Sequence, residues 1–153
     1  MQVGEPQAMS ICAAGPADFE RLTVLWEASV RATHHFLTDD YLALLRDKVR
    51  NEYLAAVELR TCRNDAGDIL GFIGVSGRKV EMLFVDPQRR GEGIGRRLME
   101  YAVREMGATE VDVNEQNPAA AGFYRHLGFE PVGRSPLDGL GRPYPVLHLR
   151  LVH

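Results

Sequence analysis

Three glycines at alternate positions mark the stretch of this sequence best suited to chemistry. Gly91, Gly93 and Gly95 follow the apolar, β-prone residues 79–85 and precede residues 94–106, whose apolar side chains repeat at helical spacing. The predicted order is therefore strand, glycine-rich loop and helix. Such a loop exposes several backbone N–H groups at the positive end of a helix dipole, and this arrangement binds phosphate groups.

The residues around the glycines exclude two common kinds of phosphate site. A nucleotide-binding P-loop ends in Gly-Lys-Ser/Thr, whereas Gly95 is followed by Arg96 and Arg97. A dinucleotide fingerprint has a third glycine where Arg96 stands, and it usually opens the first strand–helix unit of a chain. Neither a P-loop nor a dinucleotide site is predicted.

Two longer strings narrow the choice of ligand. Residues 83–95 combine Leu-x-Val-x-Pro with the string Arg90-Gly91-Glu92-Gly93-Ile94-Gly95, which has the pattern Arg/Gln-x-x-Gly-x-Gly/Ala. Residues 117–129 have the pattern Asn-x-x-Ala-x-x-Phe-Tyr-x-x-x-Gly-Phe. The first string resembles the pyrophosphate-binding motif of the GNAT superfamily of acyl-CoA-dependent N-acetyltransferases, and the second resembles another element of the same superfamily. With their flanking strands, the two motifs cover roughly the C-terminal half of the chain.

Three shorter strings resemble the YjaB-like bacterial branch of that superfamily. They are Thr33-His34-x-Phe36-Leu37, Val113-Asn114-Glu115-Gln116-Asn117 and Pro143-Tyr144-Pro145. The superfamily resemblance implies an α/β fold in which a mixed, mostly antiparallel central sheet is flanked by helices. It also implies that one pair of neighbouring strands in the sheet is splayed apart.

The resemblance implies that acetyl-CoA, as co-substrate, lies between the strand of Leu83 and Val85 and its splayed neighbour near residues 111–114. Backbone groups of Leu83 and Val85 would pair with the pantetheine arm, as a ligand strand pairs with a sheet edge. The Val85 N–H would also polarise the thioester carbonyl. Arg90 and Arg96 either add positive charge or are solvated surface residues. The implied cofactor-binding residues are Leu83, Phe84, Val85, Arg90, Gly91, Glu92, Gly93, Ile94, Gly95, Arg96, Asn117 and Tyr124.

Candidate catalytic residues follow from the same resemblance. Tyr124 matches the superfamily tyrosine that protonates the departing thiolate, and the alternative is a packed aromatic side chain beside Phe123. The general base is left open. Glu81 lies two residues from Leu83 and shares its strand face, and Asp112 stands where some relatives keep a catalytic glutamate. Glu115 and His34 are further candidates for the base, and an ordered water chain can replace all four.

An unusual connector lies at residues 31–37, where His34, His35 and Phe36 come between two predicted helices. Its histidines either interact with the last carbonyls of a helix, or the bend lines the acceptor pocket. In the second case His34, Phe36 and Glu115 are the predicted substrate-binding residues. No metal site is predicted, because adjacent histidines point apart on a helix and no third ligand follows from the sequence.

These features predict an N-acetyltransferase that moves an acetyl group from acetyl-CoA to a primary amine by direct attack. The acceptor is either a small molecule or a lysine or N-terminus of a protein. The alternative is a non-catalytic CoA-binding regulatory module. A nucleotide-binding regulator is disfavoured by Arg96, which stands where lysine or glycine would be needed.

The remaining elements position these residues. Residues 1–8 are predicted to be a flexible leader, residues 9–153 a single domain, and residues 136–143 a flexible loop. Strands are predicted at residues 9–13, 53–61, 69–75, 79–85, 110–114, 129–133 and 144–152, with helices beginning near residues 18, 38, 94 and 117.

The composition is that of an ordinary globular protein. The 153 residues are 45% hydrophobic and 25% charged, and the net charge of −3 disfavours general nucleic-acid binding. The sequence contains no apolar run long enough to span a membrane and predicts no signal peptide, so a cytoplasmic location is expected. Cys12 and Cys62 are isolated and are predicted to be small buried hydrophobic residues. Whether the protein is a monomer or a homodimer is left undetermined.

Overall fold

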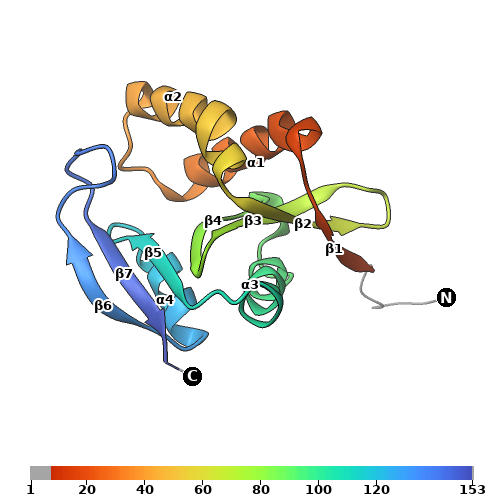
Figure 1. Ribbon diagram of the computed structural model, residues 1–153. Helices are drawn as coiled ribbons and strands as arrows, with labels where there is room; N and C mark the ends of the chain where they lie inside the picture. Colours follow the sequence, from red (N-terminus) through yellow and green to blue (C-terminus); the bar gives the residue numbers. More distant parts are fainter. Residues whose placement is uncertain (1–7, 153) are drawn as a thin grey trace.

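Seven strands form one mixed sheet in the order β1-β2-β3-β4-β5-β7-β6, and helices cover both of its faces (Figure 1). The computed structural model describes residues 8–152, so the predicted leader lies outside the described residues except for Ala8. The strands are β1 (Met9–Ala13), β2 (Glu58–Asn64), β3 (Ile69–Ser76), β4 (Lys79–Val85), β5 (Glu110–Asn114), β6 (Phe129–Ser135) and β7 (Val146–Leu151). The longer helices are α1 (Phe19–Thr33), α2 (Asp39–Lys48), α3 (Ile94–Glu105) and α4 (Pro118–His126). The expected α/β fold with a mostly antiparallel sheet is confirmed.

β4 and β5 are the parallel pair within this otherwise antiparallel sheet. They pair only through residues 79–80 and 110–111, although both strands continue further. Beyond that point residues 81–85 and 112–114 part (Figure 1), and the gap between them is called the fork. The predicted splayed strand pair is therefore confirmed.

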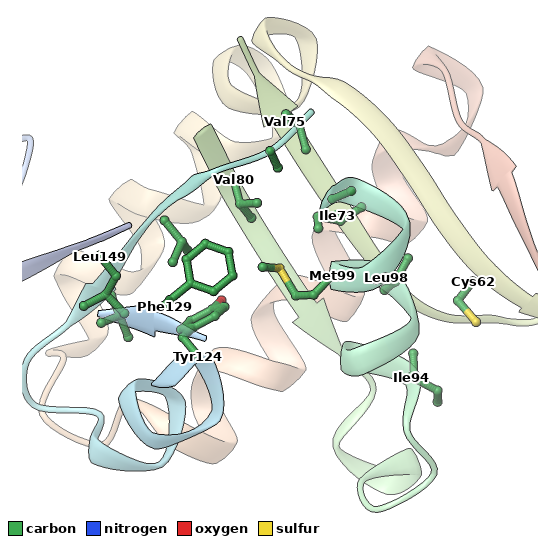
Figure 2. Packing of buried hydrophobic residues seen from close by; sticks show 14 of the residues in the cluster. Cys62, Ile73, Val75, Val80, Ile94, Leu98, Met99, Tyr124, Phe129 and Leu149 are labelled. Atoms are coloured by element: carbon green, nitrogen blue, oxygen red, sulfur yellow. The ribbon is translucent and has the colours of Figure 1, made fainter. Parts of the chain in front are cut away.

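Apolar clusters on the two faces hold the helices to the sheet. One cluster packs α3 and α4 against the sheet around Leu98 and Phe129, as Figure 2 shows. The other packs α1 and α2 on the opposite face around Leu22 and Phe72, which are fully buried. The strands that carry the fork are thereby fixed from both sides.

The two glycines inside β3, Gly71 and Gly74, allow close approach of neighbouring groups. A Cβ on Gly71 would lie 2.9 Å from Ile94 Cγ2 and 3.0 Å from the backbone oxygen of Phe84. A Cβ on Gly74 would lie 2.6 Å from Val57 Cγ2. Gly71 therefore lets the first residue of α3 sit directly on the sheet.

The predicted helix starts are also confirmed. Thr38 Oγ1 accepts a hydrogen bond from the Tyr41 amide at 3.2 Å, and Asn117 Oδ1 accepts one from the Ala120 amide at 3.3 Å. These side chains satisfy amides that have no partner within the first turn of a helix.

The strand predicted at residues 53–61 is wrong over its first half. Val49–Tyr53 form a π-helical turn, Leu54–Ala56 form a 3-10 turn, and β2 begins only at Glu58. Val49 and Leu54 are almost fully buried, with 2% and 1% of their surface exposed. The π-helical turn lets Val49 and Leu54, five positions apart, both enter the core, and this burial outweighs the local β propensity of the segment.

The loop before β7 contains hydrogen bonds of its own, and its flexibility stays a prediction. Asp138 Oδ1 accepts hydrogen bonds from the amides of Leu140 and Arg142 at 3.0 and 2.9 Å. Tyr144, predicted to open the last strand, instead stacks on Tyr41 of α2 with ring centroids 5.3 Å apart. Pro145 then has no amide for a strand ladder, so β7 starts at Val146, two residues later than predicted.

We expect Gly71→Ala to destabilise the fold, because the new Cβ would press on the backbone of β4 as well as on Ile94. The expected loss is about 1–3 kcal/mol of unfolding free energy, measured by urea denaturation. Gly122→Ala in α4 is the matched control, because an added Cβ there meets no atom within 4 Å. Equal stability of the two variants would contradict the close approach.

Candidate functional site

A cavity of about 410 Å³ lies where β4, the glycine loop, α4 and the end of α1 meet. Every residue predicted to bind the cofactor lines this main cavity except Glu92. The carboxylate of Glu92 instead lies 3.9 Å from the guanidinium of Arg89. The strand, loop and helix predicted from the sequence are thus brought to one site, together with Asn117 and Tyr124 from the second motif.

The fork exposes main-chain groups on the β4 side of this site. The Asp86 amide donates to the oxygen of Leu70 in β3 at 2.9 Å. Because hydrogen bonding alternates along an antiparallel pair, Phe84 and Met82 also face β3, whereas Leu83 and Val85 turn their N–H and C=O groups into the fork. Those groups lie where an extended ligand can pair with them.

The glycine loop places further free amides at the start of α3. Gly91 and Gly93 have φ of 83° and 77°, in the left-handed region that favours glycine, and a Cβ on either would meet no atom within 4 Å. Gly93 is the N-cap and offers no side chain. Within residues 8–152 we find no hydrogen-bond partner for the amides of Gly93, Gly95 and Arg96. This concavity is suited to an anion.

Two arginines differ in how they meet the main cavity. Arg90 and Arg96 both line it. The Arg96 guanidinium is paired with Glu100 at 2.9 Å, and 62% of its side chain is exposed. The charge of Arg96 is therefore matched by Glu100, whereas no carboxylate partner of Arg90 is found within residues 8–152.

Tyr124 is buried between the main cavity and the fork. Its ring packs edge-on against Phe123 and Phe129, with centroids 5.2 and 6.2 Å away, and Figure 2 shows it beside Phe129. Burial raises the pKa of the Tyr124 hydroxyl above its ordinary value. The hydroxyl is therefore protonated near neutral pH and can act as a proton donor.

A smaller cavity of about 110 Å³, the fork cavity, lies between β4 and β5 and is lined by Glu81 and Asp112. The carboxylate of Asp112 is shared between Lys79 Nζ at 2.5 Å and His148 Nδ1 at 2.7 Å. Burial lowers the pKa of Lys79, but the hydrogen bond and charge of Asp112 outweigh it and raise that pKa overall. Both carboxylate oxygens of Asp112 are thus occupied by Lys79 and His148, whereas Glu81 is exposed.

A third cavity of about 210 Å³, the side cavity, lies between α1, α2, β4 and the loop before β7. Aromatic and aliphatic residues form most of its wall, and Glu81 and Asp138 are the carboxylates that line it. The Tyr41 hydroxyl donates to Asp138, and the Arg142 guanidinium lies 4.8 Å from the Tyr41 ring centroid. Burial and the Asp138 hydrogen bond raise the pKa of Tyr41. These contacts join α2 to the loop.

The three residues predicted to bind the acceptor are placed differently. His34 lines all three cavities. The Phe36 ring packs between His34 and Tyr144, and its centroid lies 5.3 Å from that of His34 and 5.8 Å from that of Tyr144. Glu115 lies outside these cavities and forms a two-bond ion pair with Arg134 at 2.6 and 3.0 Å.

Sequence reasoning missed Tyr41, Asp138 and Tyr144 as parts of the site. The string at residues 143–145, which carries part of the resemblance, is the sequence signal that points to Tyr144. Tyr41 and Asp138 are 97 positions apart in the chain, so no local pattern links them.

For residues 8–152, we observe no helix long and apolar enough to cross a membrane. The same residues contain no group of three or more His, Cys, Asp or Glu that could hold a metal ion.

Comparisons with known proteins agree with this geometry. Residues 52–131 match the family model described as the acetyltransferase (GNAT) domain. The peptidyl-lysine N-acetyltransferase YjaB of Escherichia coli is 43% identical to this chain over 133 residues, which cover 87% of this chain and 90% of that protein. YjaB of Salmonella typhimurium is 42% identical over 130 residues, covering 85% and 89%.

A solved structure shows the same fold. The solution structure of apo YjaB from Escherichia coli superimposes with a TM-score of 0.86 at 41% identity, covering 95% of this chain and 98% of that one. GNAT acetyltransferases use acetyl-CoA as the acyl donor, which agrees with the free amides of the fork and the glycine loop. The chain therefore belongs to the GNAT acetyltransferase family and is an acyl-CoA-dependent N-acetyltransferase.

Proposed function

We propose that this acetyltransferase transfers the acetyl group of acetyl-CoA to the side-chain amines of protein lysines. The observation that carries the proposal is the side cavity, which is apolar and aromatic, contains two carboxylates, and meets the main cavity at His34 and Phe84. The methylene chain of a lysine packs on apolar and aromatic walls, and its ammonium is attracted by carboxylates and by aromatic faces. The YjaB relatives are named as peptidyl-lysine N-acetyltransferases, which supports the same acceptor class.

The proposed cofactor site uses main-chain groups for most of its contacts. Leu83 and Val85 bind the pantetheine arm through the fork, and the loop amides from Gly91 to Arg96 hold the diphosphate with Arg90 beside them. Asn117 lies on the α4 side of the same cleft. Support comes from the unpaired amides and from the shared lining of the main cavity. Glu92 contributes its backbone only, because its carboxylate would repel a diphosphate.

The proposed reaction is a direct attack within the junction of the cavities. The amine nitrogen adds to the thioester carbon, and the Val85 N–H stabilises the oxyanion that forms. The C–S bond then breaks and Tyr124 gives its proton to the departing sulfur. Over the whole reaction an ammonium loses two protons, of which one ends on the sulfur of CoA and one is released to solvent.

The cytoplasmic location stays a prediction from the sequence.

A panel of acceptors tests the acceptor class. Release of CoA thiol should be measured with a lysine peptide, a lysine-free peptide with a free N-terminus, and small alkyl amines. We expect the lysine peptide to give the highest kcat/KM. A higher value for the free N-terminus or for a small amine would contradict the lysine assignment while leaving the transferase activity in place.

Gly93→Glu should weaken CoA binding, because a carboxylate would occupy the place of the diphosphate. We expect the Kd for CoA, measured by calorimetry, to rise at least about 30-fold, which corresponds to about 2 kcal/mol. Gly67→Glu is the matched control, since Gly67 has the same left-handed backbone with φ of 83° and open space around it, but lies in the β2–β3 turn. Unchanged affinity in Gly93→Glu would contradict the role of the loop.

Tyr124→Phe should lower kcat and leave the Kd for CoA unchanged, because only the proton donor is lost. The expected fall is about 10- to 100-fold, at the lower end of general acid catalysis, since a thiolate leaves readily without a proton. Tyr101→Phe in α3 is the control, because that hydroxyl is bonded to Arg60 Nε at 3.4 Å, away from the cavities. Equal kcat in both variants would show that Tyr124 is a packing residue.

Glu81→Gln should raise the KM for a lysine peptide about tenfold with little change in kcat, because the carboxylate attracts the ammonium before reaction. An aryl amine, which is neutral at pH 7, serves as the internal control and should keep its KM. A proportional rise for both acceptors would show that Glu81 does not recognise charge.

A further inference from the structure

His34 occupies the point at which the three cavities meet. It follows the last residue of α1, and its amide donates to the oxygen of Val30 at 2.7 Å. His34 and Phe84 are the two residues that line the main, fork and side cavities alike. An amine that enters through the side cavity and a thioester held along β4 therefore come together beside the imidazole.

The hydrogen bonds around His34 determine which ring nitrogen carries the proton. Thr33 Oγ1 donates its single proton to the oxygen of Ser29 at 2.9 Å. The 2.7 Å contact between Thr33 Oγ1 and His34 Nδ1 must then be donated by the imidazole. Nδ1 thus carries the hydrogen in the neutral ring. Nε2 is left with its lone pair, and no residue among 8–152 is found to bond to it.

The lowered pKa of the His34 imidazole favours the neutral ring, which is the form that accepts a proton. Burial lowers the pKa of the imidazole below its ordinary value, the charges of Arg90 and His35 lower it further, and the oxygen of Val30 only partly opposes them. The other titratable or charged groups that line the same cavities are Arg89, Arg96, Glu81, Asp112, Asp138, Tyr41, Tyr53, Tyr124 and Tyr144. The ring is therefore neutral near pH 7 and becomes protonated only at acidic pH.

The other candidates for the base are less well placed. Asp112 is held by Lys79 and His148, and Glu115 is held by Arg134. Glu81 lines the fork and side cavities but not the main cavity. A carboxylate, with an ordinary pKa of about 4, is also a weaker base near neutral pH than an imidazole.

We propose that His34 is the general base of the acetyl transfer, an assignment that rests on the proposed function. The attacking amine is neutral, because the ammonium has already lost one proton to solvent. As the C–N bond forms, positive charge develops on the attacking nitrogen and its hydrogens become acidic. His34 Nε2 accepts a second proton, the tetrahedral intermediate collapses, and the C–S bond breaks while Tyr124 gives its proton to the sulfur and then regains one from solvent. The imidazolium then releases its proton to solvent, which returns the ring to the neutral form.

His34→Gln and its matched control His35→Gln test the assignment, because His35 is adjacent, exposed and outside the three cavities. With saturating acetyl-CoA and lysine peptide, we expect kcat of His34→Gln to fall about 100-fold, while His35→Gln keeps the wild-type value. The wild-type kcat should fall with pH below about 6.5, the ordinary imidazole value. His34→Gln should lack that acidic limb. The Kd for CoA should be the same in all three proteins.

Two further measurements separate chemistry from structure. Added imidazole should restore part of the kcat of His34→Ala but not of Tyr124→Phe. Thr33→Val removes the acceptor of Nδ1–H, so the imidazolium loses a partner and the acidic limb should move to lower pH without loss of CoA binding.

Three outcomes would overturn the assignment. They are a His34→Gln kcat within twofold of the wild type, retention of the acidic limb in that variant, or equal losses in His34→Gln and His35→Gln. Each of them leaves the proposed acceptor intact, provided that the wild type acetylates the lysine peptide. A wild-type protein that binds CoA but acetylates no amine would refute the proposed function and the base together.

Discussion

The parallel pairing of β4 and β5 stops after two residues on each strand, and the cavities beside β4 follow from that early stop. Two strands that stay paired satisfy each other's main-chain groups, whereas these strands pair through residues 79–80 and 110–111 and then part. The amides and carbonyls of Leu83 and Val85 remain available as a consequence. The packed clusters on both faces of the sheet keep the gap from closing, and an extended ligand can take the place of the missing strand.

The main cavity and the side cavity differ in charge, because different elements line them. The start of α3 and Arg90 present positive charge and free amides, which suit a diphosphate. The side cavity presents Glu81 and Asp138, which suit a cation. Both cavities are lined by His34, whose pKa is lowered by burial.

The parts of the site that lie within continuous stretches of chain were predictable. The strand, the glycine loop and the start of α3 lie within residues 79–95, and the second motif begins at its own N-cap, Asn117, so residue types and spacing were sufficient there. The side cavity was not predictable, because Tyr41 meets Asp138 only through the tertiary fold. The helical turns at residues 49–56 were missed for a related reason. The burial of Val49 and Leu54 against the sheet decides their conformation, and that burial is not visible in local β propensity.

The close approach at Gly71 connects the core of the protein to the glycine loop. The same small position touches Ile94, which opens α3 directly after the glycine loop, and the carbonyl of Phe84 on the strand that carries the fork. This one contact in the core consequently fixes both the distance of α3 from the sheet and the path of β4. A natural variant that enlarged this buried position would shift both walls of the cleft at once, although it would touch neither substrate.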